Sequence, residues 1–268
     1  MSRISKCFER LSNENKKALV IYIMAGDPDR SVTVELMHEM VAAGVSMIEL
    51  GVPFTDPEAD GPVIQEAAKR ALAQNISLRD TLEMVARFRE RDQDTPIVLM
   101  GYLNPIEKMG YEAFAKAAST AGVDGTITVN VPPEEGEVLD RLLIEHDVDP
   151  VYLLAPTTSE DRARLIFSKT RGFAYYVSLK GTTGAATLDV VDVRERLAKL
   201  RPHATVPIAV GFGIKTGAAA AEVAGIADGV VIGAAVVGIM GEAAPADVPG
   251  KVAGFVRQIR AAMDADGA

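Results

Sequence analysis

Eight short runs of apolar, largely β-branched residues recur along the chain, separated by longer amphipathic segments. Most of the runs are apolar throughout instead of alternating with polar residues, a pattern typical of parallel strands buried on both faces. The predicted strands span residues 19–24, 47–50, 97–101, 125–129, 151–154, 174–178, 207–211 and 229–232. Strands and helices that alternate in this way predict an α/β fold built on a parallel sheet.

The segments between the strands have the length and periodicity of helices. We predict helices over residues 31–43, 63–74, 78–89, 111–121, 135–145, 159–170, 190–200 and 217–223. Ser31 is the expected N-cap of the first of these. A further helix over residues 4–12 precedes the first strand, and another over residues 251–263 follows the last. Residues 241–250, which are rich in Ala and Pro, and residues 264–268 are expected to be irregular.

Eight strand–helix units without a break in composition predict one domain over residues 1–268, folded as a closed (β/α)8 TIM barrel with an extra N-terminal helix. The length agrees, because such a barrel needs roughly 250 residues. An open doubly wound sheet is the alternative, and the lack of a Gly-x-Gly-x-x-Gly motif after the first strand disfavours it. Catalytic side chains of barrels lie at the C-terminal ends of the strands. We therefore consider a polar residue a catalytic candidate only if it lies at or just after such an end, and we call this criterion the positional filter.

The composition excludes several classes of partner. A net charge of -9 disfavours binding to nucleic acids or anionic membranes. The longest apolar stretch, residues 229–240, is shorter than the ~18 residues that span a bilayer, and the first residues lack the apolar region of a signal peptide. The single cysteine, Cys7, forms no internal disulfide, which fits a reducing compartment. We therefore expect a cytoplasmic protein.

Glu49 lies near the end of the second predicted strand, and the loop that follows carries Asp56, Glu58 and Asp60. Glu49 shares strand parity with Met47, so one orientation points both side chains toward the barrel interior. Burial there would raise the pKa of Glu49 into a range useful for acid–base chemistry. Two carboxyl groups on either side of a pocket can divide acid and base roles, but the spacing does not choose among the three loop acids.

Three glycine-bearing turns follow late strands, at residues 181–185, 211–213 and 233–235, the last at the start of a predicted short helix. Backbone N–H groups at such places bind phosphate without a lysine, and phosphate sites after strands seven and eight recur in barrels. Lys180 follows strand six. The favoured interpretation is a lysine of a lid loop, and the alternative is a Schiff-base lysine.

The three histidines fail the positional filter. His38 lies in the middle of a predicted helix, His146 at the end of another, and His203 before a strand on the opposite face of the barrel. No Cys/His cluster has the spacing of metal ligands. We therefore expect neither a catalytic triad nor a metal site.

Several longer motifs occur in order along the chain. They are Ala-Gly-Asp-Pro at 25–28, the block 49–65, Met-Gly-Tyr-Leu-Asn-Pro at 100–105, Val-Pro-Pro-Glu-Glu at 131–135, Tyr-Tyr-Val-Ser at 175–178, Thr-Gly at 183–184, Ala-Val-Gly-Phe-Gly-Ile at 209–214 and Asp-Gly-Val-Val-Ile-Gly at 228–233. This set resembles the alpha subunit of tryptophan synthase over nearly the whole chain. The resemblance implies retro-aldol cleavage of indole-3-glycerol phosphate to indole and glyceraldehyde 3-phosphate. It also implies an alpha2beta2 heterotetramer, in which indole passes to a beta subunit that holds pyridoxal phosphate, with no cofactor in this chain.

The resemblance also assigns roles to single residues. Glu49 and Asp60 match the two catalytic carboxylates of the family. The substrate-binding positions are matched by Tyr22 in the wall of the indole pocket, Tyr175, Thr183 in the lid, and Gly184, Gly213, Gly233 and Ala234 around the phosphate. Asn130 stands where the family often has Asp, and Ala234 where a serine commonly donates a hydroxyl group. These departures concern affinity and communication between subunits more than the class of reaction.

Three other functions are compatible with the same residues. The first alternative is a free-standing lyase that releases indole without a partner. The departure from the family pattern at Asn130 favours this alternative slightly. The second alternative is a binding or activating subunit with little catalytic activity. The presence of both Glu49 and Asp60 argues against it. A phosphosugar aldolase that uses Lys180 is the third alternative.

Overall fold

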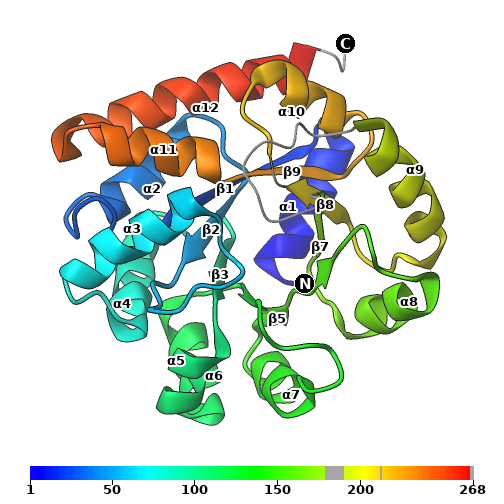
Figure 1. Cartoon of the computed structure of the whole chain (residues 1–268), viewed down its shortest axis with the longest axis horizontal. Coiled ribbons are helices and arrows are strands. Elements are labelled where there is room, and N and C mark those ends of the chain that lie inside the picture. The colour runs from blue at the N-terminus through cyan, green and yellow to red at the C-terminus, as the bar shows by residue number, and fades with distance from the viewer. Residues whose placement is uncertain (179–189, 212, 266–268) are drawn as a thin grey trace.

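The computed structural model describes residues 1–178, 190–211 and 213–265. Its strands form one parallel sheet in the order β5-β4-β3-β2-β1-β9-β8-β7-β6. They are β1 Ala18–Met24, β2 Met47–Gly51, β3 Ile97–Gly101, β4 Gly125–Thr128, β5 Asp149–Pro150, β6 Leu153–Leu154, β7 Ala174–Val177, β8 Ile208–Gly211 and β9 Gly229–Ile232. Helices surround these strands as a ring, and α1 lies across the centre of the view (Figure 1).

The expected fifth strand is divided into β5 and β6, which stand at opposite ends of the strand order although they are close in sequence. On one side, the Val151 amide donates to the carbonyl oxygen of Thr126 at 2.9 Å, and on the other the Tyr175 amide donates to that of Tyr152 at 3.1 Å. The segment therefore joins both ends of the sheet and closes the barrel. The barrel prediction is confirmed, whereas one continuous strand over 151–154 is wrong.

The helices follow the expected alternation with a few differences. Their bounds are α1 Arg3–Asn13, α2 Thr33–Ala42, α3 Pro62–Ala73, α4 Leu78–Arg89, α5 Leu103–Met109, α6 Tyr111–Ala121, α7 Glu137–Glu145, α8 Glu160–Lys169, α9 Val190–Leu200, α10 Gly217–Ala224, α11 Ala234–Glu242 and α12 Val248–Ala265, with short 3-10 helices at Arg201–His203 and Pro245–Asp247. None of the helices in these described ranges is long and apolar enough to cross a membrane.

Three expectations about the helices were wrong. Ser31 does not cap α2, because its hydroxyl donates to Asp29 at 2.6 Å and the helix begins at Thr33. The seven-residue helix α5 was not predicted, since it is short and Pro105 in its first turn has the character of a helix breaker. Residues 241–250 are not irregular throughout, because a 3-10 turn and the first turn of α12 lie within them.

The barrel interior is filled by apolar side chains from the strands, and apolar residues of α1 pack against them. Val20, Met47 and Val231 belong to this interior cluster, together with Ile4 and other apolar residues of α1. The apolar side chains of α1 recur at the 3- and 4-residue spacing of one helix face, and Ser2 caps the helix by accepting the Ser5 amide. Cys7 is free and buried on this face, where its thiol donates to the carbonyl oxygen of Ser46 at 3.3 Å.

Candidate active site

The side chains of Tyr22 and Glu49 meet at the C-terminal mouth of the barrel. The two residues are paired across β1 and β2, two positions after the interior residues Val20 and Met47. Because strand side chains alternate between faces, Tyr22 and Glu49 point into the mouth above those residues. The regular pairing of β2 from Met47 to Gly51 is what the parity argument for Glu49 requires.

Glu49 is 1% exposed, and its Oε2 atom has no hydrogen-bond partner among the described residues. Burial, and then the negative charge of Asp60, raise the pKa of Glu49 to about 8. A carboxyl group with such a pKa is mostly protonated at neutral pH and is able to act as an acid.

Asp60 lies in the loop between β2 and α3 and is only partly buried. The Tyr102 hydroxyl donates to its Oδ2 atom at 3.2 Å. Burial raises the pKa of Asp60 to about 6, and the hydrogen bond from Tyr102 opposes this rise. The neighbouring acids Asp56 and Glu58 are exposed to solvent. Of the three acids of this loop, Asp60 alone is both partly buried and directed at groups of the mouth.

Tyr175 on β7 faces the mouth from the other side of the barrel, next to Ala209 of β8. A Cβ atom on Gly211 would overlap the Tyr175 hydroxyl group, just as one on Gly51 would overlap that of Tyr22. Burial raises the pKa of both tyrosines, with a further contribution from the carboxylates. Both phenols are thus neutral, and each lies close to the backbone of a glycine at the rim.

The glycines after β8 and β9 lie at adjacent strand ends, since Gly211 is paired with Val231. Gly213 has a φ of 78°, a conformation that favours glycine. Gly233 precedes α11, in which the first intrahelical bond runs from the Val237 amide to the carbonyl oxygen of Gly233 at 3.0 Å. The amides before Val237, including that of Ala234, therefore lack intrahelical acceptors and are suited to an anion. Thr183, Gly184 and Lys180 lie outside the described residues.

Two polar features of the mouth were not anticipated. Tyr102 comes directly after β3, so the positional filter at strand ends would have found it. Asp27, after β1, is fully buried and accepts two hydrogen bonds from Arg70, from Nε at 2.6 Å and from Nη2 at 3.0 Å. This ion pair fixes the loop after β1 to α3, the helix that follows the Asp60 loop.

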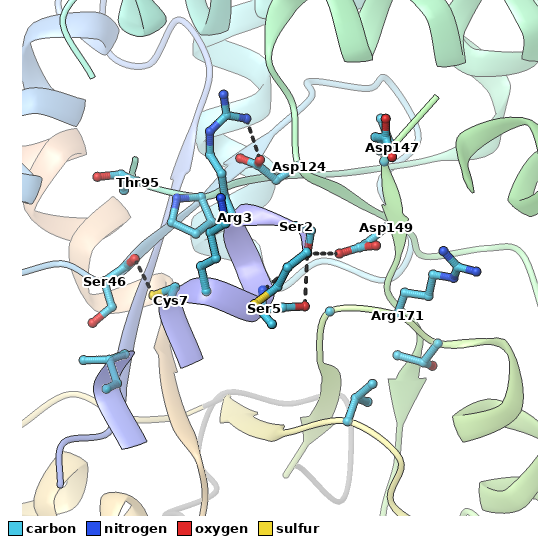
Figure 2. Close-up of a pocket in the computed structure, with 18 of the residues that line it drawn as sticks. Ser2, Arg3, Ser5, Cys7, Ser46, Thr95, Asp124, Asp147, Asp149 and Arg171 are labelled. Atoms are coloured by element: carbon cyan, nitrogen blue, oxygen red, sulfur yellow. Dashed lines mark hydrogen bonds and ion pairs between the residues drawn. The ribbon is translucent and has the colours of Figure 1, made fainter. Parts of the chain in front are cut away.

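A cavity of about 2240 Å³ lies at the opposite end of the barrel, around α1. Figure 2 shows Arg3 bound to Asp124 and Ser2 bound to Asp149 in this cavity. None of the predicted site residues that the structure describes lines it. Among the described residues, no group of three or more His, Cys, Asp or Glu side chains is placed to hold a metal ion.

The chain is similar to known proteins over nearly its whole length. A family model described as "Tryptophan synthase alpha chain" matches residues 8–262. The tryptophan synthase alpha chain of Thioalkalivibrio sulfidiphilus is 54% identical over 266 residues, which cover 98% of this chain and 100% of the relative. That of Nitrosococcus oceani is 54% identical over 267 residues, covering 99% and 98%.

Solved structures give the same result. The tryptophan synthase subunit alpha of Legionella pneumophila superposes with a TM-score of 0.92 at 43% identity and covers 99% of both chains. A chain of Mycobacterium tuberculosis tryptophan synthase superposes with a TM-score of 0.89 at 32% identity and covers 98% of both.

Proposed function

The chain belongs to the tryptophan synthase alpha chain family, and from that premise we propose how the groups at its barrel mouth perform the family reaction. The reaction is a carbon–carbon cleavage of tryptophan biosynthesis, in which indole-3-glycerol phosphate gives indole and glyceraldehyde 3-phosphate. The observation that carries the proposal is the placement of two carboxyl groups at the barrel mouth, with Glu49 1% exposed and Asp60 partly buried and bonded to Tyr102. This placement raises the pKa of Glu49 to about 8 and that of Asp60 to about 6. At neutral pH, one is mainly an acid and the other mainly a base.

Glu49 is the proposed acid and base at the carbon that is cleaved. Indole is a poor carbanion leaving group, so ring carbon C3 has to gain a proton before the C–C bond breaks. The protonated Glu49 supplies that proton and becomes a carboxylate. It then takes the proton of the side-chain hydroxyl as the C–C electrons return to the ring and the aldehyde forms, which restores its starting state.

Asp60 is the proposed partner of the ring nitrogen. Protonation at C3 leaves positive charge on this nitrogen, and an ionised carboxylate that accepts its N–H hydrogen bond stabilises that charge. The pKa of about 6 keeps Asp60 mostly ionised at neutral pH. Tyr22 and Tyr175 line the apolar part of the pocket, and Tyr175, beside Glu49, orients the acid or the substrate.

The phosphate group is assigned to backbone amides, which reconciles an anionic substrate with a net charge of -9. Gly213, Gly233 and Ala234 supply the described part of this site, and Gly184 completes it on the basis of the resemblance. Thr183 is assigned to a lid contact with Asp60 on the same basis.

An alpha chain implies a beta partner. We propose an alpha2beta2 heterotetramer in which the beta subunit holds pyridoxal phosphate and receives the indole, while this chain needs no cofactor of its own. We also propose that residues 1–268 fold as one domain and that the complex is cytoplasmic.

Indole release from indole-3-glycerol phosphate tests the mechanism directly. Wild type, Glu49→Gln and Asp60→Asn would be compared with and without a beta subunit. We expect wild type to be active and stimulated by the partner, and each substitution to lower kcat by at least about 100-fold. Near-normal turnover in Glu49→Gln would refute the assigned role. High activity that the partner does not change would favour a free-standing lyase.

A further inference from the structure

We propose that Tyr102 is a positioning residue that fixes the Asp60 carboxylate for the reaction, and that Asn130 fixes Tyr102 in turn. The proposal rests on the proposed role of Asp60. It joins three loops of the barrel mouth, those after β2, β3 and β4, into one support for a single carboxyl group.

The hydroxyl group of Tyr102 is held in one orientation. Its oxygen accepts the backbone N–H of Ala59 at 3.0 Å, while its O–H donates to Oδ2 of Asp60 at 3.2 Å. Because the N–H group can only donate, the hydroxyl proton is directed at the carboxylate. The Tyr102 ring also stacks on Phe54 at 5.2 Å between centroids, and its side chain is 5% exposed. Ring and hydroxyl together therefore hold the loop that carries Asp60 at three points.

Asn130 holds the backbone next to Tyr102. Tyr102 occupies the N-cap position of α5 but its side chain makes no capping bond there. Instead, Oδ1 of Asn130 accepts the Leu103 amide at 2.8 Å, and its Nδ2 donates to Asn104 at 3.5 Å. An N-terminal amide of α5 is thereby satisfied by a side chain from the loop after β4. The direction of Tyr102 toward Asp60 thus depends on a loop that touches neither catalytic carboxylate.

This arrangement divides the two oxygens of Asp60 between support and chemistry. Oδ2 accepts the Tyr102 hydroxyl, whereas Oδ1 receives no hydrogen bond from the described residues and is left for the substrate. A donor at Oδ2 stabilises the ionised form of Asp60. The titratable groups that face Asp60 are Tyr22 from β1, Glu49 from β2 and Tyr102 after β3, and of these only Tyr102 donates to it.

Tyr102→Phe is the decisive variant, because it keeps the ring against Phe54 and removes only the hydroxyl. We expect the pKa of Asp60 to rise by about one unit, the size of a hydrogen bond to a charged group. The acid limb of kcat/KM should then move up by the same amount, with a loss of about 5-fold at pH 6 and almost none at pH 8. The limb that belongs to Glu49 should stay in place.

Two controls separate this role from general damage. Tyr152→Phe removes a hydroxyl that donates to Asp140 at 2.9 Å, a buried Tyr–Asp pair away from the mouth, and should leave the profile unchanged. Asn130→Ala should move the acid limb in the same direction as Tyr102→Phe. Asn130→Asp keeps an oxygen that accepts the Leu103 amide and should leave the limb near its wild-type position.

The pKa of Asp60 is measured by ¹³C NMR of protein labelled at the aspartate carboxyl carbons, with the resonance assigned by its loss in Asp60→Asn. This titration needs no substrate, so it tests the positioning role even if wild type releases no indole, a result that would defeat only the proposed function. An unchanged Asp60 titration in Tyr102→Phe would overturn the inference, as would an equal shift in Tyr152→Phe.

Discussion

Burial of Glu49 should lower the free energy of unfolding by an amount that depends on pH. Its pKa is about 8 in the folded protein, raised by burial and then by Asp60, against an ordinary value of 4.5. Between these two values the unfolded chain has lost the proton that the folded protein still binds. The free energy of unfolding therefore falls as the pH rises from 4.5 to about 8 and is level above that.

The size of the effect follows from the gap between the two pKa values. Each unit corresponds to about 1.4 kcal/mol, so a gap of about 3.5 units gives a penalty of about 5 kcal/mol at high pH, as an order of magnitude. Glu49→Gln removes this titration. Relative to the variant, wild type should therefore lose about 2 kcal/mol between pH 6 and pH 8.

Urea unfolding of wild type and Glu49→Gln at pH 6, 7 and 8 measures this change. The test is how the difference between their free energies of unfolding varies with pH, so any pH-independent effect of the glutamine cancels. Glu66→Gln is the matched control. The carboxyl group of Glu66 is exposed beside Lys69, which lowers its pKa, so any dependence there runs in the opposite direction. A difference between wild type and Glu49→Gln that is the same at pH 6 and pH 8 would refute the assignment of Glu49 as a buried neutral acid.

Three further predictions concern the rest of the mouth. Gly211→Ala should destabilise the protein by about 1–3 kcal/mol in urea unfolding and lower kcat, because the added Cβ overlaps the Tyr175 hydroxyl. Arg70→Met should cost about 3 kcal/mol in the same assay, since it leaves the fully buried Asp27 carboxylate unpaired. Ala234→Ser should tighten a glycerol-phosphate analogue by roughly 10-fold in isothermal titration calorimetry, because it adds one hydroxyl donor beside the phosphate amides.

Each of these variants has a matched control. Gly61→Ala adds the same atom where the structure leaves open space, and should be nearly neutral. Arg91→Met breaks an exposed ion pair with Glu35 and should cost less than about 1 kcal/mol. Ala235→Ser places a hydroxyl one position further along α11. A result for any variant that equals its control would contradict the contact on which the prediction rests.

The sequence predicted those parts of the fold that depend on burial alone. Strands that are covered on both faces must be apolar throughout, so seven of the eight runs gave single strands close to their observed positions. The fifth run failed because its pairing changes from β4 to β7 between β5 and β6, a change of partner that hydrophobicity does not record. The N-cap at Ser31 failed for a similar reason, since Asp29 competes for its hydroxyl.

The site was predictable to the extent that it depends on strand parity. Glu49 follows from its register with Met47, whereas the choice of Asp60 over Asp56 and Glu58 came from the family resemblance. The strand-end position of Tyr102 marks it as a residue of the mouth, but its hydrogen bond to Asp60 was not predictable, because no pattern in the loops after β2 and β3 encodes where the two loops meet. The lid residues Thr183 and Gly184 stay a prediction.

The barrel is closed by its shortest pairings. β5 and β6 each pair over only two residues, whereas β1 pairs over five with β2 and over four with β9. The carboxyl groups of Glu49 and Asp60 belong to the arc from β1 to β4, and Tyr175 and the phosphate amides to the arc from β7 to β9. The two carboxyl groups are thus tied together by the longer pairings of β1, β2 and β3, while the ring that joins them to the phosphate amides includes the two-residue pairings of β5 and β6. The distance between acid and base is therefore set by the most extensively paired part of the sheet.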